Sequence, residues 1–300
     1  NAPRRVGGVI GVADTSRKDG AQLTHCSSDY RLESSMADAG IARYYDRLNR
    51  WNAVARAFGY GRGGALTVHR TLADPLSNGA PTTTRLHDLL IDALPRLEAP
   101  LVFDAGCGQG GTLLALASRL QATCVGVTLS ENQAATAMQA ARDAGFGGRV
   151  RVLVQSYDTP PPGPYDLVVA IESLAHSPSP RTSVAALVQA LGPRGVFVVV
   201  DDMPEALARS SADLATFMSG WQCPVLWGQD DYLRALAKSG LDVIVNRDLT
   251  GETRPRRLSA IRALEVLNRA VSRTIPSLAL REVLQSHFGG LALERLTRLG

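Results

Sequence analysis

The sequence has few aromatic residues and no concentrated block of positive charge. Aromatic residues make up 5% of the 300 residues, and the net charge of +4 comes from basic residues that are scattered apart from RPRR at Arg254–Arg257. Nucleic-acid binding needs a basic stripe interleaved with aromatic side chains. We therefore expect no nucleic-acid partner. RPRR is interpreted as a solvated surface cluster, with binding of an anionic group of a ligand by paired arginines as the alternative.

Cysteine is also sparse, and long apolar runs are missing. Cys26, Cys107, Cys124 and Cys223 form no CxxC pair and have no metal-ligand spacing. We expect free thiols in a reducing cytoplasm and no bound metal. With no apolar run of about 18 residues and no signal-peptide pattern, the sequence predicts no membrane span and a cytoplasmic location.

The middle of the chain alternates between apolar strand-like runs and amphipathic helical runs. Strand-like runs are expected at 99–105, 122–130, 149–155, 165–172, 195–201 and 241–248. Nearly continuous apolar strands separated by helices are typical of a parallel sheet covered on both faces. The fold class predicted is α/β, a doubly wound and mostly parallel Rossmann-like sheet, with N-terminal helices and an inserted helical lid.

Three regions follow from this pattern. Residues 1–36 are polar and weakly periodic, which predicts a flexible N-terminal arm. Residues 37–98 contain helical spacing at 37–58 and 83–97, which predicts a helical cap, and its helices could support a homo-oligomer. Residues 99–300 form the predicted ligand-binding domain, with a helical lid from about residue 203.

The stretch VFDAGCGQGG at 102–111 places one acid, Asp104, at the end of a strand and follows it with four glycines. Glycines let the backbone approach a ligand and adopt positive φ, and the following helix N-terminus offers free N–H groups. In a doubly wound sheet this first strand end is a ligand-binding position. We therefore expect an adenine-containing ligand here.

Two ligands compete for this turn. Gly106, Gly108 and Gly111 satisfy the GxGxxG dinucleotide pattern, so an NAD(P)-dependent oxidoreductase is one alternative. Asp104 would repel a pyrophosphate but attract a cationic ligand. The acid expected about 20 residues further on is also missing, since residues 127–129 are uncharged.

The pattern Asp-x-Gly-x-Gly-x-Gly beginning at Asp104 resembles the first motif of class I S-adenosylmethionine-dependent methyltransferases. The resemblance implies that the strand-end acid and the turn backbone hold the methionine part of S-adenosyl-L-methionine. It assigns to the cofactor the turn residues Asp104, Gly106, Cys107, Gly108, Gln109 and Gly110.

GVTLSENQAATA at 126–137 is similar to the sterol, tocopherol and cyclopropane-fatty-acid branch of that family. ARYYDRLNRW and GGALTVHR are similar to actinobacterial prenyl or terpenoid C-methyltransferases. The resemblance implies that Thr128 and Leu129 border the ribose and adenine, and that Gln133 contacts the cofactor. A Ser130–Gln133 capping box would explain Gln133 equally well.

Residues 154–178 match the next two family segments. The resemblance places Tyr157 and Asp158 at the adenine, although Asp-Thr-Pro is also a good turn opener. Glu172 and His176 follow a predicted strand, where Glu172 could contact the cofactor, remove a proton or stabilise a cation. The alternatives are that Glu172 fixes the loop and His176 only lines the cofactor pocket. Tyr45 matches the family's cofactor-covering helix, or else packs in the core.

The function that these segments imply is methyl transfer from S-adenosyl-L-methionine to a small-molecule acceptor. Methylation of a carbon atom in a prenyl, terpenoid-like or other natural product is favoured, and O- or N-methylation is the alternative. The catalytic candidates are Glu172, His176 and Tyr45. Family members usually end in an antiparallel strand, but LALERLTRLG is helical. We therefore expect the last strand to be missing from the sequence or the sheet to be shorter.

Overall fold

The computed structural model describes residues 6–14, 38, 40–48, 66, 67, 69–274 and 278–299. Its strands are β1 (Val6–Asp14), β2 (Leu72–Asp74), β3 (Ala80–Thr82), β4 (Leu101–Ala105), β5 (Thr123–Thr128), β6 (Val150–Val154), β7 (Tyr165–Ile171), β8 (Leu191–Pro204) and β9 (Asp242–Asp248). Its labelled α-helices are α2 (Thr84–Ala93), α3 (Gly111–Arg119), α4 (Glu131–Asp143), α5 (Pro180–Gln189), α6 (Ala212–Trp221), α7 (Gln229–Lys238), α8 (Leu258–Thr274) and α9 (Leu278–Leu299). Single 3-10 turns lie at Pro75–Ser77, Leu174–His176, Ala206–Ala208 and Thr250–Glu252.

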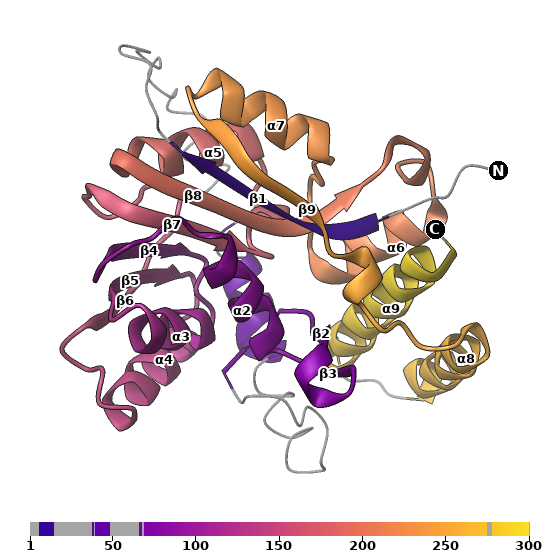
Figure 1. Ribbon diagram of the computed structural model, residues 1–300. Coiled ribbons are helices and arrows are strands. Elements are labelled where there is room, and N and C mark those ends of the chain that lie inside the picture. The colour runs from indigo at the N-terminus through magenta and orange to yellow at the C-terminus, as the bar shows by residue number, and fades with distance from the viewer. Residues whose placement is uncertain are drawn as a thin grey trace, which may run out of the picture.

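One large sheet organises the molecule, with strand order β6-β5-β4-β7-β8-β1-β9 (Figure 1). The first five strands in this order pair in parallel. The strand order reverses beside β4, so the carboxyl ends of β4 and β7 open on a crevice. The predicted doubly wound α/β fold is confirmed.

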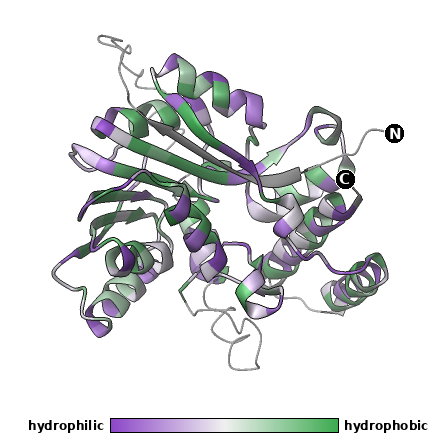
Figure 2. Cartoon of the chain, viewed as in Figure 1, coloured by the Kyte–Doolittle hydropathy of each residue, from purple (hydrophilic) through white to green (hydrophobic). Residues whose placement is uncertain are grey.

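Both faces of the sheet are buried, as the apolar strands predict. On one face, Val102 and Val198 pack with Leu90 of α2 and Leu113 of α3. On the other face, Phe103 and Phe197 belong to a second cluster formed with α5 and α7. The middle strands are accordingly mostly green in Figure 2. A strand buried on both sides has no place for polar residues, which is why these strands were readable from the sequence.

Strand β1 overturns the prediction of a flexible arm for the residues that it contains. It lies antiparallel between β8 and β9, from Val6 opposite Pro204 to Asp14 opposite Val196. The predicted arm's other residues lie outside the described part of the chain. The antiparallel strand of this sheet is therefore supplied by the N-terminal region, so the expectation of a shorter sheet is also wrong. The two strands that flank β1 satisfy its backbone, and its segment VGGVIGVAD is apolar and glycine-containing, unlike the polar residues around it.

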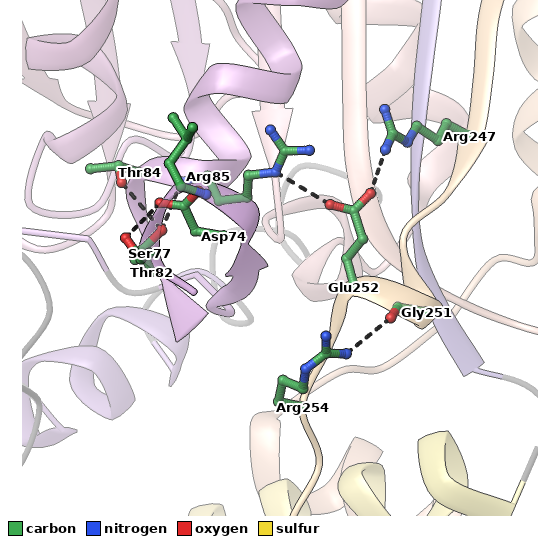
Figure 3. A network of polar contacts seen from close by, with 10 residues as sticks. Asp74, Ser77, Thr82, Thr84, Arg85, Arg247, Gly251, Glu252 and Arg254 are labelled. Carbon is green, nitrogen blue, oxygen red and sulfur yellow. Dashed lines mark hydrogen bonds and ion pairs between the residues drawn. The ribbon is translucent and has the colours of Figure 1, made fainter. Parts of the chain in front are cut away.

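The segment before β4 contains more than the predicted helices. Residues 40–48 are helical, and α2 buries Leu86, Leu89 and Leu90 as its spacing predicted. Between them β2 and β3 form a small antiparallel hairpin. Figure 3 shows Glu252, after β9, accepting from Arg85 of α2 at 3.4 Å and from Arg247 of β9 at 2.5 Å. This shared carboxylate joins the helical segment to the edge of the sheet.

The chain after β8 is mainly helical. Trp221 of α6 donates from its indole Nε1 to Ser286 O of α9 at 3.1 Å, so these two helices are packed together. Among the described helices, none combines the length and the apolar character that crossing a bilayer requires.

Candidate active site

The glycine turn connects the end of β4 to the start of α3. Gly106, Gly108 and Gly110 have φ of 89°, 52° and 86°, a region that favours glycine. A Cβ at Gly106 would lie 2.6 Å from the Ser173 Cβ. The turn therefore brings the backbone against the end of β7, as a ligand-binding turn requires.

Asp104 ends β4 with only 2% of its surface exposed. Its Oδ2 is buried without a hydrogen-bond partner, and so is the Ser173 hydroxyl; these are the two such buried side-chain atoms in the described part of the chain. Burial raises the pKa of Asp104 to about 7. An unpartnered buried carboxylate oxygen is costly unless a ligand supplies a donor or a positive charge.

A cavity of about 1070 Å³, part of it open to solvent, lies over this turn. Its wall contains every residue that the sequence predicted for the site except Gly110. The predicted residues in the wall are Tyr45, Asp104, Gly106, Cys107, Gly108, Gln109, Thr128, Leu129, Gln133, Tyr157, Asp158, Glu172 and His176.

Gly110 has a different role in the structure. It caps α3, and a Cβ there would lie 2.8 Å from the Ala137 Cβ of α4. The glycine at this position is therefore required by the close packing of α4 on the turn.

The end of β5 differs in detail from the predicted capping box. Ser130 does cap α4, because its Oγ accepts from Gln133 N at 3.1 Å. The Gln133 side chain, however, accepts from the Thr128 hydroxyl at 2.7 Å instead of reaching back to the cap. Ser130 Oγ also donates to Asp46 Oδ1 at 2.5 Å, which ties the helical residues 40–48 over the cavity.

Beyond β6, three polar side chains line one side of the cavity. Asp158 accepts from Ser183 Oγ at 2.5 Å, and Tyr157 donates its hydroxyl hydrogen to Ser173 O at 3.1 Å. Asp38 lies close enough to Asp158 for burial and that second negative charge to raise the pKa of Asp38. This side of the cavity is therefore rich in hydrogen-bond acceptors.

Glu172 lies directly after β7 with a φ of 48°, a conformation that is strained for a residue with a side chain. Its backbone N donates to Val200 O at 2.7 Å, and its Oε1 accepts from Arg70 N at 3.0 Å. Burial raises the pKa of Glu172 to about 7 against the lowering effect of Arg70. Its carboxyl group is therefore more easily protonated than that of an exposed glutamate.

Tyr45 and His176 form a hydrogen-bonded pair in the wall. Tyr45 Oη lies 2.5 Å from His176 Nε2, and His176 Nδ1 lies 3.3 Å from Gln222 O. Because a carbonyl only accepts, Nδ1 carries hydrogen and Nε2 accepts the Tyr45 hydroxyl hydrogen. Burial lowers the pKa of His176, which agrees with a neutral ring.

Several wall residues were not predicted, among them Asp38, Thr67, His69, Thr112 and Ser173. Thr67 and His69 lie in the segment GGALTVHR, whose similarity to terpenoid methyltransferases was the available signal. Ser173 and Thr112 directly adjoin predicted residues but carry no pattern of their own. Ser173 and Thr112 reach the cavity wall because segments distant in the chain pack together there, which the sequence alone does not indicate.

The cysteines and two arginines of RPRR lie outside the polar groups described so far, except Cys107 in the cavity wall. Cys107, Cys124 and Cys223 are buried and unpaired, while Cys26 lies outside that part of the chain. Within the same part, no group of three or more His, Cys, Asp or Glu side chains could hold a metal ion. Arg254 of RPRR donates to the backbone at Gly251 (Figure 3), and Arg256 pairs with Glu294 at 2.6 Å, so these two arginines serve local structure.

Comparisons with known proteins agree with this geometry. A family model described as a methyltransferase domain matches residues 102–195. Methyltransferase GfsG of Streptomyces halstedii is 28% identical over 65% of this chain and 70% of that protein. The 24-methylenesterol C-methyltransferase 2 of Arabidopsis thaliana is 25% identical over 55% of this chain and 48% of that protein. The chain thus spans about half the length of the plant relative.

The fold is also similar to a solved structure. The crystal structure of geranyl diphosphate C-methyltransferase from Streptomyces coelicolor A3(2) has a TM-score of 0.63 over 88% of this chain and 94% of that chain, at 19% identity. At this identity the likeness concerns the fold. Together with the family model and the sequence relatives, it confirms the resemblance noted in the sequence. Residues 102–195 match a methyltransferase domain, and the sequence relatives are methyltransferases; these findings support an S-adenosylmethionine-dependent methyltransferase with S-adenosyl-L-methionine as the cofactor.

Proposed function

We propose that this enzyme methylates a carbon atom of a small prenyl, terpenoid-like or other natural-product acceptor. The observation that carries the proposal is that one cavity contains both an unpartnered acid beside the glycine turn and a separate polar group formed by Glu172, Tyr45 and His176. The first suits a cationic cofactor, and the second suits proton transfer from an acceptor. Relatives named as sterol C-methyltransferases support the choice of carbon.

The residues around the turn fit the cofactor. Asp104 Oδ2 would accept from the ammonium group of the methionine part, and the backbone of the turn would approach it closely because Gly106 and Gly108 have no side chain. Thr128, Leu129 and Gln133 would border the ribose and adenine, with Tyr157 and Asp158 beyond them. Bound in this way, the cofactor supplies an electrophilic methyl group.

A neutral acceptor loses one proton when it gains a methyl group, so the site needs a base. Glu172 is our candidate because its carboxyl lines the cavity and its pKa is raised to about 7. A base is most effective when its pKa lies near the working pH. Tyr45 and His176 hold each other in one orientation and close the cavity on the side of Trp221.

Aromatic faces favour a carbon acceptor over oxygen or nitrogen. Methylation of an alkene carbon leaves positive charge on the acceptor, which aromatic rings and carboxylates stabilise. Tyr45, Tyr157 and Trp221 line the same cavity as Glu172. An O- or N-acceptor would need only a base and good positioning. The position of the new methyl group in the product therefore distinguishes these alternatives.

The test uses the cofactor with an isotopically labelled methyl group and a panel of acceptors, namely geraniol, geranyl diphosphate, a tocopherol-type phenol and an alkylamine. We expect transfer to carbon, read by NMR of the product. Transfer only to the phenol or the amine would contradict the carbon assignment.

The Glu172→Gln variant shows whether Glu172 acts as a base or only binds a ligand. The variant should lower kcat by at least about a hundredfold, since general-base catalysis contributes about 10²–10⁴. Its affinity for S-adenosylhomocysteine, measured by calorimetry, should stay within about threefold. Equal kcat in the variant and the parent would remove Glu172 from the mechanism.

A further inference from the structure

Arg70 contacts Glu172 but does not line the cavity. Its backbone N donates to Glu172 Oε1 at 3.0 Å, and its guanidinium Nη2 is paired with Asp202 Oδ1 of β8. The Asp202 side chain is 9% exposed and that of Arg70 is 24% exposed, so this ion pair is largely sheltered from water. Arg70 thus connects the candidate base to the neighbouring strand.

The charges around Glu172 are unbalanced. Asp201 and Asp202 lie on β8 beside it, and Arg70 is the cation that acts on it. Tyr45 and Cys223 also lie within electrostatic reach, but both remain protonated because burial raises the pKa of each well above neutrality. Among the described residues, the Arg70 guanidinium therefore interacts with the carboxyl groups of Glu172 and Asp202, and also with that of Glu294.

The backbone of Arg70 is itself fixed. Its carbonyl O lies 3.0 Å from His69 Nδ1, so that nitrogen donates and His69 Nε2 is left as an acceptor. His87 Nε2 lies 3.2 Å from His69 Nε2 and 3.2 Å from Thr112 Oγ1 at the start of α3. Burial lowers the pKa of both histidines, His87 to about 4, in keeping with neutral rings. This chain of contacts anchors Arg70 to α2 and α3.

We propose that Arg70 is the positioning residue for Glu172: its amide fixes one carboxylate oxygen, and its guanidinium, held by Asp202, keeps the carboxylate ionised and able to accept a proton from the acceptor. The proposal rests on the proposed function, in which Glu172 is the base. It adds a residue that touches neither cofactor nor acceptor. The strained backbone of Glu172 fits this role, because the hydrogen bond from Arg70 N stabilises one orientation of the Glu172 side chain.

The test observes Glu172 directly and needs no acceptor. The full chain is labelled with glutamate carrying ¹³C at the carboxyl carbon, so the aspartates stay silent, and the Glu172 signal is assigned as the one lost in Glu172→Gln. Titration by NMR should place the parent midpoint at about 7. Arg70→Gln should raise that midpoint by about one unit or more, because a neighbouring cation is lost.

Further variants sharpen the test. Arg70→Lys keeps the charge and should restore most of the shift. Asp202→Asn removes a negative charge near Glu172 but also frees the guanidinium, so it is compared with the double variant Arg70→Gln/Asp202→Asn, whose midpoint should be higher if the guanidinium acts on Glu172. Arg234→Gln is the matched control: it breaks an exposed ion pair with Asp231, and the midpoint should not change. The affinity of each variant for S-adenosylhomocysteine reports whether the fold survives.

The outcomes separate the two proposals. A midpoint that is the same in Arg70→Gln and the parent, in variants that bind S-adenosylhomocysteine normally, would overturn the role of Arg70. A shifted midpoint together with full turnover in Glu172→Gln would leave Arg70 as the partner of Glu172 but would refute Glu172 as the base. If Arg70→Gln does not fold, Arg70→Met, which keeps an unbranched side chain but not the charge, takes its place, and an unshifted midpoint there overturns the proposal.

Discussion

At the scale of single residues, the site is defined by acids whose surroundings disfavour their charge. Asp104 and Glu172 both have a pKa raised to about 7, and burial is the first cause in each case. They differ in their partners, since Glu172 has the Arg70 amide whereas one oxygen of Asp104 has none. This difference suits two roles, with Asp104 awaiting a cationic ligand and Glu172 exchanging a proton.

Asp104→Asn tests the first role. The amide keeps the shape of the side chain but loses the charge that would pair with the ammonium group. We expect the Kd for S-adenosylhomocysteine to rise about 10- to 100-fold, the equivalent of a charge-assisted hydrogen bond of about 1.5–3 kcal/mol. Calorimetry measures the Kd, and the exposed Asp143→Asn is the control. An unchanged Kd would contradict the placement of the cofactor.

At the scale of elements, the Ser130 hydroxyl makes two structural contacts. It caps α4 and holds Asp46 of the helical residues 40–48. Ser130→Ala should lower the free energy of unfolding by about 1 kcal/mol for the lost cap, and it should also weaken cofactor binding because the covering helix is released. Chemical denaturation and calorimetry measure the two effects. Ser272→Ala, on α8, should change stability by less than about 0.5 kcal/mol. Equal stability of Ser130→Ala and the parent would contradict the cap.

Strand β1 supports a second prediction at this scale. In the described part of the chain, β9 pairs with β1 and with no other strand. Deleting residues 1–14 should therefore release β9 and lower the Tm, whereas deleting residues 1–5 should change it little. Thermal unfolding followed by circular dichroism measures both. Equal Tm values for the two deletions would show that β1 contributes nothing to the sheet.

The elements also show where sequence reasoning succeeds. The parallel strands were predicted because each is an apolar run buried on both faces, a local property of strands such as β4 and β8. Strand β1 was missed because its partners lie about 190 residues away in the chain, as the pairing of Val6 with Pro204 shows. The contact of Arg70 with Glu172 spans 102 residues and has no local signal either. The site's turn was readable because glycine marks backbone that a side chain would obstruct.

At the scale of the whole molecule, buried titratable groups give stability a characteristic pH dependence. The pKa is raised to about 7 for Asp104 and Glu172, and to about 8 for Asp201, where burial acts together with the Asp202 charge. The pKa is lowered for the buried His69, His87 and His176. Acids with a raised pKa bind more protons when folded, whereas histidines with a lowered pKa bind fewer. The two sets therefore oppose each other below about pH 6.5, the ordinary pKa of histidine.

Between about pH 6.5 and 8 the effect of the acids should dominate, because unfolded histidine, half protonated at its ordinary pKa of about 6.5, has lost most of its protons by about pH 7.5. The folded chain binds more protons than the unfolded chain in this window, and the free energy of unfolding must fall as the pH rises, by at most about 1.4 kcal/mol per pH unit for each group. We expect the Tm of the cofactor-free protein to be several degrees lower at pH 8 than at pH 6.5.

Asp201→Asn should flatten this dependence of the Tm on pH, most clearly near pH 8, because it removes the acid with the highest of the three raised pKa values. Saturating S-adenosylhomocysteine should flatten the pH dependence of the Tm at the low-pH end of the window, since an ammonium group beside Asp104 favours the ionised carboxylate. Scanning calorimetry across the window measures all three slopes, and a Tm that rises with pH would mean that these carboxyl groups are ionised in the folded chain at pH 6.5.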